Sequence, residues 1–338
     1  MFRTSFLFLC QLFKGSAKHQ YNQENMTKRI KRNKLLNKFR HLQFNSRVNL
    51  SPDDIFDIHQ YKVLKQISSG RNFFAHKPTT IIADPFLFPF NNELFLFYEE
   101  LKGIEGTGII KMIKTKDLIN WSNPKTVLKE NFHLSFPNVF KINNQIYMMP
   151  ETWQNESIRL YKPNEDLTEW TFYKKILIDK SYVDSSIIQF NEKLYLFTTV
   201  NAYDTNLLKL YISDSIDSEW KEHPKSPITD NINNARCGGA VFSYNGTFYR
   251  PSQQYNINYG DGLDINVIEH LSPTEYKEKK MTSIMPNSEK FYSLGGHHIS
   301  VCRFNNKNIV ATDALAYSYN FFEIVKRIVF KFSKYNAR

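Results

Sequence analysis

The chain has 338 residues, a formal net charge of +11 and 15% aromatic residues. This aromatic content is ample for a substantial core, so the composition excludes a disordered or low-complexity protein. The three cysteines, Cys10, Cys237 and Cys302, are too few for a disulfide framework, which favours a reducing compartment. The sequence therefore predicts one large domain, with basic charge concentrated near both ends.

Residues 1–50 are predicted to form a basic N-terminal extension. The first residues, MFRTSFLFLCQLF, have a charged start and an apolar stretch that is too short to span a membrane. No persuasive small-residue cleavage site follows, which leaves a short uncleaved anchor or a signal open. Residues 28–40, KRIKRNKLLNKFR, mix basic and apolar residues at helical spacing. No nucleic-acid-binding motif is present, so nucleic acid is not an expected partner.

One hairpin pattern recurs five times along the chain, at intervals of roughly 50 residues. Each copy contains an apolar or aromatic strand, a tight turn that begins with Asn, and a second such strand. Asn tolerates positive φ and therefore suits two-residue hairpin loops. The copies cover residues 83–100, 136–152, 184–200, 238–254 and 298–314, and their first turn residues are Asn91, Asn143, Asn191, Asn245 and Asn305.

A third strand follows three of the copies and ends in a short segment that begins with Asp and finishes with Trp, at Trp121, Trp170 and Trp220. Four strands per period around a shared axis form a β-propeller, so the sequence predicts an all-β, five-bladed propeller over residues 55–316. The segment YKVLKQI, residues 61–67, is expected to close the ring as the outer strand of the last blade. The three tryptophans are expected to pack between blades.

Two sets of residues share one register relative to the five turns. Seven positions upstream of each turn lie Asp84, Phe136, Asp184, Gly238 and His298, and eight positions downstream lie Glu99, Glu151, Thr199, Gln253 and Asp313. Equivalent positions on the innermost strands of a propeller form rings, and Arg236 lies on the same side of its strand as Gly238. These groups predict a funnel of the kind that binds sugars; a solvated polar loop end is the alternative.

A set of motifs resembles, in this order, the N-terminal domain of glucosamine inositolphosphorylceramide transferase: ADPFLF, FYEE, HLSFPNVF, YMMPE, DSS, RCGGAVF, YRPSQ and YG, the last at Tyr259 and Gly260. The likeness covers most of residues 81–313, and the domain also occurs in bacterial proteins associated with surface polysaccharides. The resemblance implies that a separate exostosin-like domain carries the glycosyl transfer in the plant enzyme. These 338 residues leave no length for that domain.

More distantly, the chain resembles the five-bladed propellers of glycoside hydrolase family 43. That resemblance implies an aspartate base in the first blade, which Asp84 matches, and a pKa-modulating aspartate in the second blade, where this chain has Phe136. The third-blade position, a glutamate acid in the family, holds the shorter Asp184. Glu151 is a second candidate for the acid. The predicted catalytic residues are therefore Asp84, Glu151 and Asp184.

The same motifs and ring positions supply the predicted substrate-binding residues: Glu99, Glu100, His133, Arg236, Gln253, Tyr259, His297, His298 and Asp313. No cofactor or bound metal is expected, although a central divalent cation near His298 is left open by the resemblance to family 43. Adjacent histidines on a strand point to opposite faces, so at most one of His297 and His298 is expected to face the axis.

The predicted function is that of a carbohydrate-active protein in surface-polysaccharide or glycoconjugate assembly, acting on a glycosidic bond by transfer or hydrolysis. A non-catalytic glycan-binding module that serves a separate glycosyltransferase is the alternative. The expected partner is a sugar, a nucleotide-sugar or a lipid-linked glycan. Residues 317–338 are predicted to form a basic amphipathic helix, which favours a cytoplasmic protein in peripheral contact with the anionic inner face of the membrane.

Overall fold

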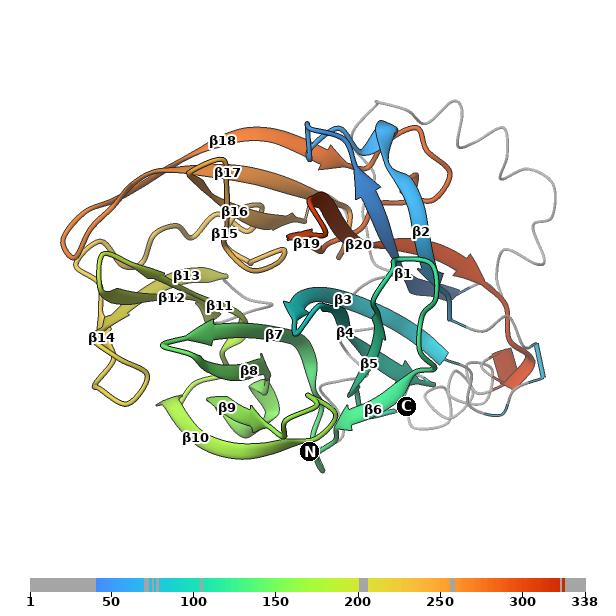
Figure 1. The fold of residues 1–338 in the computed structure, drawn as a ribbon, viewed down its shortest axis with the longest axis horizontal. Helices are drawn as coiled ribbons and strands as arrows, with labels where there is room; N and C mark the ends of the chain where they lie inside the picture. Colours follow the sequence, from blue (N-terminus) through green and yellow to red (C-terminus); the bar gives the residue numbers. More distant parts are fainter. Residues whose placement is uncertain are drawn as a thin grey trace, which may run out of the picture.

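The computed structural model describes residues 41–69, 73–74, 76, 79–103, 106–200, 206–255, 259–322 and 324–325. In this part of the chain, five antiparallel sheets of four strands each surround a common centre (Figure 1). The arrangement confirms the predicted five-bladed, all-β propeller. One blade corresponds to each copy of the repeat.

The first strand of each repeat lies innermost. From the centre outward, the first blade contains β3 (Thr79–Phe90), β4 (Glu93–Lys102), β5 (Ile109–Thr115) and β6 (Lys125–Leu128). The second blade contains β7 (Ser135–Ile142), β8 (Gln145–Glu151), β9 (Ser157–Pro163) and β10 (Trp170–Ile178). The third blade contains β11 (Val183–Phe190), β12 (Lys193–Val200), β13 (Leu207–Ser213) and β14 (Lys221–Glu222).

The last two blades are β15 (Phe242–Tyr244), β16 (Thr247–Gln254), β17 (Gly262–Leu271) and β18 (Tyr276–Met285); and β19 (Ile299–Phe304), β20 (Lys307–Ser318), β1 (His41–Ser51) and β2 (Lys62–Ile67). Two short 3-10 turns, η2 (Ile58–Gln60) and η3 (Trp153–Asn155), lie between strands.

The five hairpin turns have the backbone conformation that the sequence predicts. Their first residues all have φ between 46° and 49°, and the residue after each is also left-handed. Two successive positive φ values give a turn whose twist matches that of the flanking strands. The turns therefore fix the register of every inner hairpin, and with it the positions that reach the centre. The first turn residues are Asn91, Asn143, Asn191, Asn245 and Asn305.

The fifth blade is closed by the N-terminal end of the described chain. β2 is its outer strand, as predicted, but β1 lies between β2 and β20. The extension expected over residues 1–50 is therefore corrected, because His41–Ser51 belongs to the propeller. Its apolar residues Phe44 and Val48 face the core, and its partner strand lies more than 250 positions away in sequence, so no local pattern indicates the pairing.

Apolar side chains fill the space between neighbouring blades. Trp170, at the start of the outer strand β10, packs edge-to-face on Phe97 of β4 with ring centroids 5.7 Å apart. Trp220 is buried in the cluster that joins the second and third blades, and Trp121 packs against the cluster of the first and fifth blades. The predicted packing of the three tryptophans is confirmed.

No helix among the described residues is both long and apolar enough to cross a membrane. Helical backbone follows β20 at residues 321–322 and 324–325. The segment 1–40, with the expected anchor and the basic run 28–40, lies outside the described residues, as does most of the helix expected over 317–338.

We expect the closure of the fifth blade to depend on β1. Val48 is fully buried, whereas Val63 of β2 is 46% exposed. Val48→Ala should lower the free energy of unfolding by about 2 kcal/mol, because it removes two buried carbon atoms and leaves a cavity. Val63→Ala serves as the matched control and should have little effect in urea denaturation. Equal losses for the two variants would contradict the placement of β1 in the core.

Candidate functional site

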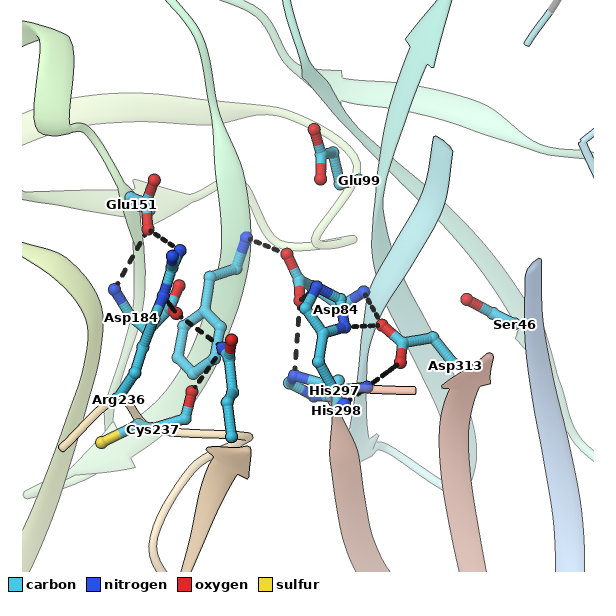
Figure 2. A network of polar contacts seen from close by, with 12 residues as sticks. Ser46, Asp84, Glu99, Glu151, Asp184, Arg236, Cys237, His297, His298 and Asp313 are labelled. Carbon is cyan, nitrogen blue, oxygen red and sulfur yellow. Dashed lines mark hydrogen bonds and ion pairs between the residues drawn. The ribbon is translucent and has the colours of Figure 1, made fainter. Parts of the chain in front are cut away.

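A backbone bulge recurs at the inner end of the first three blades. The strand pairing slips beside Asp84, Phe136 and Asp184, and all three residues are left-handed, with φ of 51°, 46° and 48°. Non-glycine residues adopt this conformation at a cost, so its repetition at one register marks a functional or structural requirement. The bulge turns these residues toward the propeller centre, where Figure 2 shows the polar network they join.

The first half of the network is built around Arg236. Its Nε donates to Asp184 Oδ2, its Nη1 donates to the hydroxyl of Tyr255 at 2.9 Å, and its Nη2 lies 3.5 Å from Glu151 Oε2. Gln253 also donates to Asp184 Oδ2, at 2.8 Å. The side chains of Arg236, Asp184 and Glu151 are at most 4% exposed, so water screens their charges weakly.

The surroundings of Glu151 raise the pKa of its carboxyl. Burial raises the pKa of its carboxyl well above the usual range, and the neighbouring Asp184 carboxylate raises it further, against the opposing effect of Arg236. The guanidinium contacts Asp184 more closely than Glu151. The Arg236–Asp184 ion pair therefore lies beside a carboxyl whose protonated form is favoured by burial.

The second half of the network is built around Asp313. Its Oδ1 accepts the backbone N–H groups of His297 and His298 at 2.9 and 3.1 Å, and its Oδ2 lies 2.6 Å from His297 Nδ1. Burial alone would lower the pKa of His297, but Asp313 raises it to about 9. The charge of His297 in turn lowers the pKa of Asp313, although burial acts in the opposite direction. An imidazolium–carboxylate pair therefore exists at neutral pH.

Asp84 lies between this pair and the second blade. Its Oδ1 is 3.8 Å from His297 Nε2 and 3.6 Å from His298 Nδ1, and its Oδ2 accepts the backbone N–H of Phe136 at 3.1 Å. Burial raises the pKa of Asp84 well above its usual range, although His297 opposes this. Burial therefore favours the protonated form of Asp84, whereas the base role implied by the family resemblance requires the ionised form.

His298 is a neutral imidazole in an apolar setting. Its ring packs edge-to-face on Phe86 and Phe136, and burial lowers its pKa to about 3. Both ring nitrogens are buried and have no hydrogen-bond partner in the described structure. An unsatisfied buried polar group is costly, so a ligand hydroxyl at this position would gain from the contact.

Tyr259 connects the two halves. Its ring packs edge-to-face on His297 at 4.9 Å, and the guanidinium carbon of Arg236 lies 5.3 Å from its centroid. Burial raises the pKa of Tyr259 well above its ordinary value, so the hydroxyl keeps its proton. Glu99 lies near enough to Asp84 for its charge to raise the pKa of that carboxyl, after the larger effects of burial and His297, and it contacts His133 at 3.3 Å. Glu100 pairs with Lys111 at 3.0 Å.

The expectation that at most one of the two adjacent histidines faces the propeller axis was wrong. His297 and His298 both come within 4 Å of Asp84 because they precede β19, where strand alternation does not apply. Two residues of the site were not predicted from the sequence. Tyr255 could have been, because it follows Gln253 at the two-residue spacing that puts side chains on one face of a strand. Phe44, which stacks on His297 at 4.4 Å, has no sequence pattern that would indicate this contact.

Among the described residues, one cluster offers metal-ligating atoms. Oxygen or nitrogen atoms of Asp84, His297 and Asp313 all lie within 4.8 Å of one another. The raised pKa of His297 means that a cation bound there would have to displace the proton of the imidazole. The central cation near His298 stays a prediction.

The His297–Asp313 pair should make stability depend on pH. A histidine whose folded pKa is near 9 stabilises the fold fully below its unfolded pKa of about 6.5, and the contribution disappears as pH rises through 9. The free energy of unfolding should therefore be higher for wild type than for His297→Gln at pH 6. This difference should shrink by about 3 kcal/mol when the pH is raised above 9. Urea denaturation across this range measures the difference, with the exposed His59→Gln as control. A difference independent of pH would contradict the ion pair.

Comparison with solved structures supports the fold. The chain is similar to the Bombyx mori GH32 β-fructofuranosidase BmSUC1, with a TM-score of 0.53 and 14% identity over 71% of this chain and 57% of that one. It is also similar to the β-1,2-mannobiose phosphorylase of Listeria innocua, with a TM-score of 0.52 and 9% identity over 72% and 92% of the two chains. At these identities the likeness shows the propeller alone.

Sequence comparison shows the family. A protein from Oryza sativa subsp. japonica named "Glucosamine inositolphosphorylceramide transferase 1" is 38% identical over 208 residues, which are 60% of this chain and 28% of that protein. The Arabidopsis thaliana protein of the same name is 32% identical over 244 residues, which are 69% and 32% of the two chains. The chain thus spans about a third of these relatives. The family profile described as "Glucosamine inositolphosphorylceramide transferase 1, N-terminal" matches residues 67–313, and the chain belongs to this family.

Proposed function

We propose that the central network is a carbohydrate-active site that acts on a glycosidic bond of a glycoconjugate. The observation that carries the proposal is the pair of buried carboxyl groups, Asp84 and Glu151, one in each half of the network, whose pKa values burial raises. Carboxyl groups with raised pKa are the acids that protonate a leaving glycosidic oxygen.

Their surroundings distinguish the two carboxyls. Burial and the Asp184 carboxylate both raise the pKa of Glu151, so it is the proposed general acid. Asp84 has the His297 imidazolium 3.8 Å away, a neighbour that favours its charged form. Asp84 is therefore the proposed general base, and in its ionised form it accepts the proton of the attacking hydroxyl.

Binding would rest on the groups between these two carboxyls. The Arg236 guanidinium lies beside Tyr259, and the His298 nitrogens lack partners. These donors and acceptors suit the hydroxyl groups of a sugar and the phosphate of a glycolipid headgroup. The names of the relatives support this substrate class, because they specify transfer of glucosamine to inositolphosphorylceramide.

A second candidate is a glycan-binding module that serves a separate transferase. One observation favours it: Asp84 and Glu151 each accept a backbone N–H from the next blade, of Phe136 and Asp184, which is a structural role for both carboxyls. The aromatic Phe136 also occupies the position where the resemblance to family 43 would put a carboxylate. A binding module would use the same funnel without turnover.

Isosteric amides test the proposed chemistry. Asp84→Asn and Glu151→Gln keep an oxygen that can accept the structural N–H but remove the exchangeable proton. Each should lower turnover by about a hundredfold to ten-thousandfold while leaving binding and thermal unfolding nearly unchanged. The assay uses nucleotide-activated glucosamine with inositolphosphorylceramide for transfer, and the glucosaminylated lipid for hydrolysis, both followed by mass spectrometry.

The exposed Asp214→Asn is the matched control and should behave as wild type. Wild-type turnover in either amide variant would show that the residue is not an acid or base. A wild-type protein that binds the glycolipid but neither forms nor cleaves the bond would favour the binding module instead.

A further inference from the structure

The C-terminal end of the described chain carries an exposed aromatic patch, defined by Phe73, Phe74 and Phe321. These side chains are 40%, 71% and 43% exposed, and their ring centroids lie 5.0 to 6.2 Å apart. The N–H of Phe321 donates to the carbonyl of Phe73 at 2.8 Å, so the two segments are fixed to each other. Figure 1 shows this corner beside the first and fifth blades.

Exposed apolar side chains are concentrated at this place. Among the described residues, twelve large hydrophobic side chains are exposed, and six of them lie in residues 73–74 and 317–325. The other six are spread along the chain at Val63, Ile119, Phe172, Ile178, Ile232 and Met281. Scattered exposed residues need no explanation, whereas a gathered aromatic patch marks an interaction surface.

After Glu323, the sequence that follows the patch is purely basic. Residues 326–338, KRIVFKFSKYNAR, contain five Lys or Arg and no acidic residue. Exposed aromatic rings next to a run of cations match the surface of an anionic bilayer, where rings enter the interface and cations contact lipid phosphates. A protein partner of ordinary composition offers no such match to a purely basic segment.

The patch lies at the same end of the propeller as the central site. β3 begins at Thr79, five residues before Asp84, and β20 ends at Ser318, five residues after Asp313. Both strands leave the site in the direction away from the Asn turns, and the patch follows on that side.

We infer that the aromatic patch docks this end of the propeller on an anionic lipid bilayer. The rings enter the interface and the basic segment 326–338 adds electrostatic attraction. Docking in this orientation turns the central site toward the membrane, where a glycolipid headgroup is presented. The binding itself does not depend on the proposed chemistry, so its test stands apart from the test of turnover.

Vesicle flotation of the full chain tests the inference. The vesicles contain phosphatidylcholine alone or phosphatidylcholine with phosphatidylglycerol. Wild type should float with the anionic vesicles, and about 0.5 M NaCl should weaken binding by screening. Phe74→Asp with Phe321→Asp should lower the partition coefficient about tenfold or more, because it removes inserted rings and adds negative charge. Lys326→Glu with Arg327→Glu should lower binding and its sensitivity to salt.

Ile119→Asp is the matched control, because Ile119 is 80% exposed in the loop between β5 and β6 and lies outside the patch. It should float as wild type does, and the thermal unfolding of all variants should be unchanged. The inference is overturned if the Phe74/Phe321 variant floats like wild type. It is equally overturned if wild type ignores anionic vesicles and sedimentation shows a dimer that these substitutions dissociate, since the patch would then join two copies of the chain.

Discussion

The central site depends on one backbone feature, the left-handed bulge at a shared register of β3, β7 and β11. Each bulge costs about 1–3 kcal/mol and turns an N–H toward the carboxylate of the preceding blade. Asp313 accepts from Asp84, Asp84 from Phe136, and Glu151 from Asp184. The carboxyl groups that offer chemistry are thus the same groups that hold neighbouring blades in register, which explains why they tolerate such deep burial.

Burial determines the charge state of the network. A buried carboxylate is stable when a cation is bound to it, and the network provides one cation for each half: Arg236 for Asp184, and His297 for Asp313. Asp84 and Glu151 each share a cation that contacts another carboxylate more closely, and burial raises the pKa of both. These two carboxyls are therefore the groups best placed to exchange a proton with a ligand.

The repeat period and the Asn turns were sufficient to predict the five blades, the inner position of the first strand in each repeat, and the register that brings Asp84, Asp184 and Asp313 to the centre. This works because hairpins are local and side-chain direction alternates along strands. Pairing between strands that are distant in sequence was not predictable. Because β1 pairs with β20 near the other end of the chain, the contact of Phe44 with His297 was not predicted. The orientation of both histidines depends on irregular backbone before β19, which strand alternation does not describe.

The central claim is that Glu151 keeps its proton at neutral pH inside the network. Infrared difference spectroscopy between wild type and Glu151→Gln tests it directly, because a protonated carboxyl and a carboxylate absorb in separate regions. The account predicts that wild type at pH 7 shows a carboxylic-acid C=O band that the variant lacks, with no change in the carboxylate bands. A variant that instead lacks carboxylate absorption would show that Glu151 is ionised, and would contradict the account.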